Sequence, residues 1–351
     1  NKATLIPASV EKLLSAVSVN ENQRAMAQAL RSAGSKRTVL LGNLAAAHPQ
    51  FAVIRTLAVV IAKLSAAKLG YLGEANNTAG AWLAGVLPHR QAAGETVETA
   101  GLDAHAMLTQ GLKGYLLLGL EPELDSWDGA KALDALKKAD FVVALSAYST
   151  PALESYADVI LPMALFTETS GTYVNGAGQW QSFTGIVNPP GEARPAWKIL
   201  RVLGNLFDLE SFDYIGSDQV RDELRSLVGD KKANNQAGWQ IPTSLTFDLA
   251  NGLQRITEMP IYAVDALVRR ADALQQTNDA KITKGVHLNE KVAAQLGLDE
   301  NGPVQVKQNG ANITLPMVLD ERVPDDGVLI YAGQMANFEL GAWHGQIELS
   351  A

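Results

Sequence analysis

Cysteine is absent from all 351 residues, and this absence excludes several kinds of chemistry. Iron–sulfur clusters are held by cysteine thiolates, with histidine replacing only some of them, so this chain cannot bind a cluster through the usual ligands. Disulfide bonds, thiolate catalysis and cysteine-ligated zinc sites are excluded for the same reason. The five histidines are scattered and form no pair at metal-ligand spacing, so we predict structural or surface roles for them.

Long apolar runs and concentrated positive charge are missing as well. The longest apolar stretch, Phe51 to Leu64, is interrupted by Arg55 and is too short to span a bilayer, so we predict no direct membrane insertion. No basic tract could neutralise a phosphate backbone, which argues against a nucleic-acid partner. Acidic residues concentrate in residues 271–351, which carry five basic and eleven acidic side chains.

Common catalytic motifs are also lacking. No G-x-G-x-x-G motif opens a helix, so a nicotinamide dinucleotide site is unsupported. The stretch Ser65–Lys68 matches S-x-x-K, but it ends an amphipathic helix and has no companion K-T-G, so we reject a serine nucleophile there. Four carboxylates, Glu121, Glu123, Asp125 and Asp128, follow one another in a polar loop and are predicted to be solvated surface.

The residues that are present, 47% of them hydrophobic, predict an α/β fold. Short, continuous apolar runs are typical of parallel strands covered on both faces, and here they alternate with helical patterns. The sequence therefore predicts Rossmann-like parallel sheets. The predicted strands cover residues 37–41, 115–118 and 141–145, and the predicted helices cover residues 22–33, 51–64, 129–138 and 218–228, with a further helix whose first turn contains Pro195.

Three regions are predicted along the chain. Residues 1–150 form a Rossmann-like α/β domain, residues 151–270 a second α/β region with a glycine-rich hairpin and helices, and residues 271–351 a small β-barrel with one helix. In the last region, Asn289 is a helix N-cap, Gly297 stops that helix, and Asn309–Gly310 is a strong signal for a two-residue hairpin turn.

Apolar stripes give the predicted buried faces of two helices. Periodicity places Phe51, Ile54, Leu57, Ala58, Ile61 and Leu64 on one face of the first helix. In the helix after Pro195, the predicted buried stripe consists of Ile199, Val202, Leu203, Leu206 and Phe207.

The glycine-rich stretch from Gly171 to Phe183 has two interpretations. Its glycines could let the backbone approach a phosphate, whereas its flanking residues form strands and its centre, Asn175–Gly178, consists of good turn residues. A glycine cluster alone is a weak motif, so the hairpin is favoured.

Several segments in this order resemble the molybdopterin oxidoreductase superfamily. The strand–helix–strand pattern of "LLLGLEPELD" and "ADFVVALSAYSTPALESYADVILPM" is similar to that family, as are "PPGEARPAWKIL" and the tail from "VHLNEKVAAQLGLDENGPVQV" to "VPDDGVLI". A further segment resembles the pattern E-x-x-G-T-x-x-N…Q through Glu168, Gly171, Thr172, Asn175 and Gln181. The stretch "GEANNTAGAWLAGVLPHR" favours one offshoot of the superfamily, the large iron–sulfur subunits of bacterial NADH–quinone oxidoreductase (respiratory complex I).

Departures from the family pattern argue against a bound pterin. Gln179 and Trp180 stand where molybdenum enzymes commonly carry arginines, a cysteine ligand to the metal is impossible, and the acidic tail suits a pyrophosphate poorly. We therefore assign no catalytic, cofactor-binding or metal-binding residue in this chain. The tail is expected to be a barrel of the pterin-dinucleotide type that no longer binds one.

The resemblance to these large iron–sulfur subunits implies a role and partners. It implies [2Fe–2S] and [4Fe–4S] clusters on an amino-terminal portion that has no counterpart here, and the chain also lacks a starting methionine. We expect a carboxyl-terminal piece, inactive alone, that serves as a scaffold beside other peripheral-arm subunits, cytoplasmic and at the inner face of the bacterial plasma membrane. The alternatives are an active molybdopterin-dependent oxidoreductase or its fragment, and an unrelated binding protein with a Rossmann-like sheet.

Overall fold

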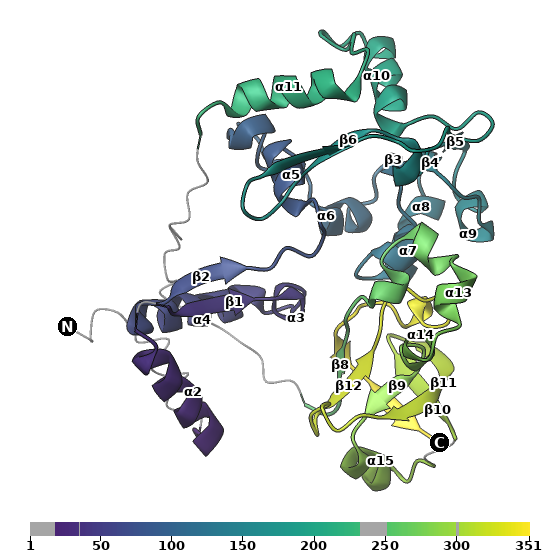
Figure 1. The fold of residues 1–351 in the computed structure, drawn as a ribbon. Helices are drawn as coiled ribbons and strands as arrows, with labels where there is room; N and C mark the ends of the chain where they lie inside the picture. The colour runs from purple at the N-terminus through teal and green to yellow at the C-terminus, as the bar shows by residue number, and fades with distance from the viewer. Residues whose placement is uncertain (1–17, 35, 232–250, 300–301) are drawn as a thin grey trace. The chain divides into compact units, whose positions relative to one another are not determined.

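A computed structural model describes residues 18–34, 36–231, 251–299 and 302–351. The chain forms two compact units, one of residues 1–76 with 231–249 and one of residues 77–230 with 250–351. Both units contain parallel strands, and the second also contains a seven-stranded, barrel-like sheet (Figure 1). The predicted α/β class with a small β-barrel is confirmed.

The first unit is built around two parallel strands. Strand β1 pairs with β2 from Thr38↔Lys68 to Leu41↔Tyr71. The amide of Asn20 and its side-chain oxygen both bond to Gln23, which fixes the start of α2. The elements are α2 (Glu21–Ser32), β1 (Thr38–Leu41), α3 (Asn43–Ala46), α4 (Phe51–Ser65) and β2 (Lys68–Tyr71).

Helix α4 buries a face that agrees with the prediction only in part. Ile61 and Leu64, both assigned to the buried stripe, are exposed. Ala58 is buried as predicted, and the other buried residues, Thr56, Val59, Val60, Ala62 and Ser65, lie outside the predicted stripe. The periodicity misled because the helix is apolar on nearly every side, so spacing alone could not select the inner face.

A three-stranded parallel sheet organises the second unit. Its strands, in spatial order, are β3 (Gly114–Leu118), β4 (Phe141–Ser146) and β5 (Val159–Pro162). The crossover helices α8 (Gly129–Lys137) and α9 (Pro151–Glu154) supply Leu136 and Leu153 to the core on one face of this sheet. The elements that precede β3 are α5 (Thr78–Leu83), η2 (Ala92–Gly94) and α6 (Ala104–Thr109), and α7 (Pro122–Asp125) precedes α8.

The glycine-rich stretch is a hairpin, as predicted. Strands β6 (Gly171–Val174) and β7 (Trp180–Phe183) pair antiparallel. Helices α10 (Ala196–Leu206) and α11 (Ser217–Val228) follow it along the chain.

The predicted buried stripe of α10 is wrong in part. Val202, Leu206 and Phe207 are exposed. The fully buried position is Gly204, where an added Cβ would lie 2.1 Å from Phe212 Cδ1. The helix therefore packs inward through its smallest residue, because only a glycine leaves room for the Phe212 ring.

The last part of the chain forms the barrel-like sheet, drawn in green to yellow in Figure 1. Val286, Val304, Val306, Val328 and Ile330 are fully buried in its core. The strand order is β13–β8–β12–β9–β11–β10–β14. The bounds are β8 (Gln254–Ile256), η4 (Ile261–Ala263), α12 (Ala266–Arg269), α13 (Asp272–Gln275), α14 (Asn278–Ile282), β9 (Val286–Leu288), α15 (Glu290–Leu296), β10 (Pro303–Gln308), β11 (Ala311–Leu319), β12 (Gly327–Ile330), η5 (Phe338–Leu340), β13 (Gly345–Gln346) and β14 (Glu348–Ser350).

The predicted local signals of this region are confirmed. Asn289 accepts a hydrogen bond from Val292 N at 2.9 Å, and Gly297 ends α15 with φ +64°. Asn309 and Gly310 have φ of +50° and +86° and join β10 to β11. The sheet also takes in β8, which lies before residue 271, while the three-region division stays a prediction. Within the described ranges, no helix has the length and apolarity needed to cross a bilayer.

Candidate functional site

Polar residues follow the carboxyl ends of β3 and β4, the edge where open parallel sheets bind ligands. Glu121 comes three residues after β3, and Ser146 ends β4. Ser146 Oγ donates to Tyr148 O at 2.8 Å and accepts from Tyr148 N at 3.2 Å. Thr150 Oγ1 accepts from Leu153 N at 3.1 Å and caps α9. The hydroxyl groups of Ser146 and Thr150 therefore form local hydrogen bonds that stabilise a turn and a helix cap.

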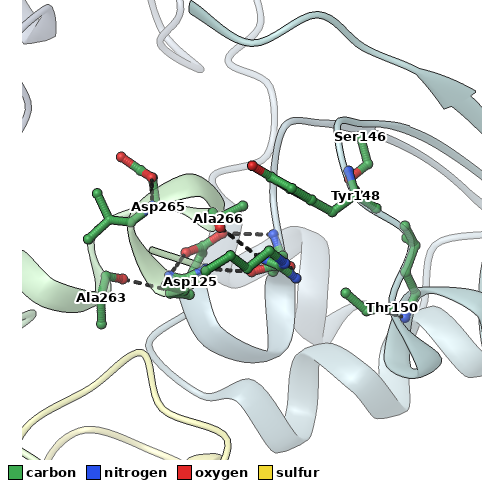
Figure 2. A network of polar contacts seen from close by, with 12 residues as sticks. Asp125, Ser146, Tyr148, Thr150, Ala263, Asp265 and Ala266 are labelled. Atoms are coloured by element: carbon green, nitrogen blue, oxygen red, sulfur yellow. Dashed lines mark hydrogen bonds and ion pairs between the residues drawn. The ribbon is translucent and has the colours of Figure 1, made fainter. Parts of the chain in front are cut away.

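Two arginines next to each other in sequence, Arg269 and Arg270, contact side chains that follow β3 and β4. Figure 2 shows this polar network around Asp125, Tyr148 and Ala266. Arg269 Nη1 donates to Glu121 Oε2 at 2.8 Å, and its Nη2 donates to Asp125 Oδ1. Arg270 Nη2 donates to the other oxygen of Glu121. The guanidinium of Arg270 also lies 4.5 Å from the centroid of the Tyr148 ring, at cation–π distance. We call Glu121, Asp125, Arg269 and Arg270 the arginine–carboxylate cluster.

Backbone oxygens accept further hydrogen bonds from both guanidinium groups. Arg269 Nε donates to Ala263 O at 3.0 Å, and Arg270 Nη1 donates to Ala266 O at 2.8 Å. The side chains of Arg269 and Glu121 are each only 8% exposed. Each charged group in the cluster is thus paired inside the protein, as burial requires.

The pKa values of two neighbouring carboxyl groups are shifted in opposite directions within one helical turn. Burial alone would raise the pKa of Glu121, but the hydrogen bonds and charges of Arg270 and Arg269 outweigh it and hold that pKa below its ordinary value. Glu123 has no such partner: burial first, then the charges of Glu121 and Asp125, raise its pKa. Burial followed by the charges of Glu123 and Glu121 also raises the pKa of Tyr156.

The prediction that these carboxylates are solvated surface is wrong. Glu121 is 6% exposed, and Glu123 and Asp128 are each 3% exposed. Asp125 is partly exposed. The reason is that α7 is a single turn enclosed by residues far away in sequence, which the local pattern of a polar loop does not reveal.

A buried arginine of the barrel-like sheet, Arg255, lies near Asp128 of the same region. Arg255, on β8, donates through Nη1 to Gln308 Oε1 at 3.1 Å and to the carbonyl oxygens of Gly341 and Ala342. Burial lowers the pKa of Arg255 to about 10, opposed by the charge of Asp128. Trp343 N donates to Trp127 O at 2.9 Å.

A cleft of about 290 Å³ borders the arginine–carboxylate cluster. Arg269 forms part of its wall, but the guanidinium is already bound to two carboxylates. The lining residues are Leu124, Tyr262, Ala263, Arg269, Gln275, Thr283, Lys284, Gly333, Gln334, Met335 and Ala336.

The residues of this segment that match the family pattern make mainly local contacts, within the hairpin or in the turn before it. Asn175 Oδ1 accepts from Ala177 N and Gln179 N, both at 3.0 Å. Glu168 Oε2 accepts from Leu165 N at 2.9 Å. Thr172 Oγ1 lies 3.0 Å from Ser182 Oγ across the strands, and Gln181 is exposed. A Cβ on Gly171 would lie 2.8 Å from Phe183 Cζ.

Two arginines of α11 lie beside the hairpin. The sequence showed only that the hairpin has Gln179 and Trp180 where relatives carry arginines, and it did not predict these two. Arg221 Nη1 donates to Ser182 Oγ at 3.2 Å, and Arg225 lies 5.4 Å from the Trp180 ring centroid. Arg221 is also paired with Asp222 at 2.7 Å.

Two of the histidines and Ser65 occupy structural positions. His287 Nε2 lies 2.9 Å from Ile282 O, and His105 stacks on Trp127 with ring centroids 4.8 Å apart. Ser65 Oγ donates to Ile61 O at 2.7 Å within α4. In the described part of the chain, no group of three or more histidine, aspartate or glutamate side chains is arranged to hold a metal ion.

These features define an α/β protein whose strand-end edge is occupied by its own charged side chains. The sequence profile of the molybdopterin oxidoreductase family matches residues 9–206. That match covers more than half of the chain, so the chain belongs to the molybdopterin oxidoreductase family.

Individual relatives are similar over shorter stretches. A 68-residue stretch is 47% identical to the 78 kDa subunit of mitochondrial NADH-ubiquinone oxidoreductase from Candida albicans, covering 19% of this chain and 9% of that protein. Over 120 residues the chain is 29% identical to nitrate reductase from Synechocystis sp., covering 34% of this chain and 17% of that protein. The matched stretches thus span less than a fifth of either relative.

A solved structure supports the fold. Acetylene hydratase from Pelobacter acetylenicus superposes with a TM-score of 0.53 over 66% of this chain and 38% of that chain, at 17% sequence identity. At this identity the likeness concerns the fold alone.

Proposed function

We propose that this chain is a scaffold portion of a large iron–sulfur subunit of the NADH–quinone oxidoreductase type and carries no cofactor of its own. In this role it supports electron transfer from NADH to quinone by [2Fe–2S] and [4Fe–4S] clusters on polypeptide outside it. Its partners are the cluster-bearing portion and the other subunits of the peripheral arm, at the cytoplasmic face of a bacterial plasma membrane.

The arginine–carboxylate cluster is the observation that carries this proposal. A molybdopterin carries a phosphate or pyrophosphate, which needs free cations or backbone donors. At the strand-end edge, Arg269 and Arg270 are already bound to Glu121 and Asp125. The neighbouring Glu123 and Asp128 are buried in the same region and supply no cation to it. The residues present therefore do not fit an anionic pterin at this edge, and we derive no step through one.

The 47% identity to the 78 kDa subunit supports the same proposal over its 68 residues.

The second candidate is a molybdopterin-dependent oxidoreductase or a fragment of one. The 29% identity to nitrate reductase over 120 residues favours that candidate, and so do the arginines beside the hairpin.

Metal content and partner recovery separate these two functions. We expect the purified chain to contain molybdenum and tungsten far below stoichiometry and to release no fluorescent pterin on oxidation. We expect a tagged copy in the source cell to recover peripheral-arm subunits of NADH–quinone oxidoreductase. Stoichiometric molybdenum or tungsten with a releasable pterin would favour the second candidate and sink the scaffold proposal.

A further inference from the structure

The turn of α7, with its N-cap Glu121, places two glutamates of the second unit in opposite surroundings. Glu121 and Glu123 are two positions apart, and side chains at that spacing do not share one face of a helix. Glu121 accepts hydrogen bonds from Arg269 and Arg270. Glu123 is 3% exposed and lies close enough to Tyr156, a residue of the core beside β3 and β4, to raise the pKa of its hydroxyl. One side of the turn therefore holds an ion pair, and the other holds a buried carboxyl group.

The carboxyl group of Glu123 lacks the partners that its burial calls for. Among the described residues, its Oε2 has no hydrogen-bond partner, and neither has the hydroxyl of Tyr156. Buried polar atoms nearly always have one. The hydroxyl can form a bond to the carboxyl group, but it supplies no positive charge. A buried carboxyl group without a cation tends to keep its proton.

The charges around Glu123 balance only when Glu123 is neutral. The arginine–carboxylate cluster consists of two carboxylates and two guanidinium groups, and both guanidinium groups are bound to those carboxylates. An ionised Glu123 would add a third negative charge to the same turn. Burial and the charges of Glu121 and Asp125 raise the pKa of Glu123, whereas a bond to its own backbone and the charge of Arg269 lower it by less.

Tight packing couples Glu123 to the rest of the turn. A Cβ added to Gly129, the first residue of α8, would lie 2.0 Å from Glu123 O, so α8 packs directly on the backbone of α7. Glu121 N donates to Asp125 Oδ2 at 2.7 Å and closes the turn. Hydration of an ionised Glu123 therefore requires α7 to move, and the same turn holds the carboxylates that bind Arg269.

We propose that Glu123 makes α7 a pH-sensitive latch between the β3–β4–β5 sheet and the segment that leads into the barrel-like sheet. In the closed state Glu123 is protonated, and Glu121 and Asp125 hold Arg269 and Arg270. When the pH rises, Glu123 releases its proton to solvent, and the buried negative charge displaces α7 and weakens the bonds to both arginines. The latch is compatible with either candidate function.

The two glutamates together set the pH range of the closed state. The charged and titratable groups that face Glu123 are Glu121, Asp125, Arg269 and Tyr156. Closure requires Glu121 to be ionised, and its pKa is held below 4.5 by Arg270 and Arg269 against the effect of burial. Closure also requires a proton on Glu123, whose pKa is raised above 4.5. The latch is therefore closed near pH 4.5 and opens as the pH rises through the folded pKa of Glu123.

Two measurements on the whole chain test the latch. Carbon-13 NMR of labelled glutamate side chains follows ionisation from about pH 4 to about pH 8, and Glu123→Gln identifies the Glu123 signal by removing it. Hydrogen exchange, corrected for the intrinsic effect of pH, follows the amides of Leu124, Asp125 and Ser126, which are hydrogen-bonded within the turn. Amides of β4 report any opening of the whole unit, and Glu192→Gln, at an exposed glutamate, is the matched control.

We expect the Glu123 signal to titrate above 4.5, and exchange of the α7 amides to rise about tenfold or more over the same pH range while β4 stays protected. Glu123→Gln should keep α7 protected throughout, and the control should behave like the unsubstituted protein. A Glu123 signal that titrates at or below 4.5 would overturn the proposal even if Glu123→Gln failed to fold. So would α7 exchange that does not follow the titration, or that rises equally in Glu123→Gln.

Discussion

Arg269 Nη1 lies 2.8 Å from Glu121 Oε2, and the two side chains are almost completely buried together. Arg269 comes from α12 and Glu121 from the turn after β3, so this pair connects the strand-end edge of the parallel sheet to the segment that leads into the barrel-like sheet. The pair occupies the place where an open α/β sheet offers a ligand its binding site. Its energetics can be tested directly.

Arg269→Met should strongly destabilise the second unit. The substitution leaves Glu121 with one cation and Asp125 with none, and removing one partner of a buried ion pair costs about 3–5 kcal/mol. The measurement is the free energy of unfolding in urea, followed by tryptophan fluorescence. Lys138→Met is the control, since Lys138 and Asp134 form an exposed pair that contributes at most about 0.5 kcal/mol. A loss of less than about 1 kcal/mol for Arg269→Met would contradict a buried, mutually dependent cluster.

Glu121→Gln and Glu123→Gln should change stability with opposite dependence on pH. The pKa of Glu121 is lowered in the folded protein, so its ionised form stabilises the fold above the ordinary value of 4.5, and that stability is lost as pH falls through the folded pKa. The pKa of Glu123 is raised, so the folded state loses stability as pH rises from 4.5 through the folded pKa.

Relative to the unsubstituted protein, Glu123→Gln should therefore gain stability as the pH rises above about 4.5, whereas Glu121→Gln should lose stability as the pH rises toward about 4.5 and change little above it. Urea unfolding at several pH values measures both differences. Curves with the same sign of slope for the two variants would show that the arginines do not distinguish these carboxylates.

Gly171→Ala should destabilise the hairpin. The new Cβ would lie 2.8 Å from Phe183 Cζ, and overpacking of this kind costs about 1–3 kcal/mol. Gly176→Ala, where no atom lies within 4 Å, should be nearly neutral. Thermal unfolding compares the two, and Phe183→Leu should restore part of the loss in Gly171→Ala. Equal effects at both glycines would show that the contact with Phe183 is unimportant.

Asn289→Ala should cost more than the loss of an ordinary helix cap. Asn289 caps α15 and also donates through Nδ2 to Val323 O at 2.9 Å and to Asp325 Oδ1 at 3.0 Å, and it is buried. We expect a loss of about 2–3 kcal/mol, because buried partners are left unpaired. Asp103→Ala, at the exposed cap of α6, should cost about 1 kcal/mol or less. Comparable losses in chemical denaturation would contradict this ranking.

Local signals were sufficient to predict most of the longer elements. The Asn289 cap, the Gly297 stop and the Asn309–Gly310 turn act over a few residues, so the sequence alone determines them. The strands β3 and β4 were recognisable because continuous apolar runs are typical of parallel strands. The buried face of α4 was not, because Val59 and Ile61 are equally apolar and only packing decides between them.

The arginine–carboxylate cluster could not be predicted in the same way. Glu121 and Asp125 lie in a short polar turn, and Arg269 and Arg270 look like the charged end of a surface helix. Nothing in either segment indicates that they meet. The uneven charge was one indication, because four carboxylates lie within eight residues. If such carboxylates are buried, they need cations from another part of the chain. The sequence does not show which cations these are.

The separation of these partners along the chain has a consequence for how the protein folds. Glu121 is 148 residues from Arg269 and 149 from Arg270, so forming these bonds requires closing very long loops, whereas β3 and β4 need only a short crossover. Contacts between distant residues form slowly because the chain must first lose that entropy. We therefore expect pulse-labelling hydrogen exchange during refolding to protect the amides of β3 and β4 well before those of α12, and simultaneous protection would show that the two segments collapse together.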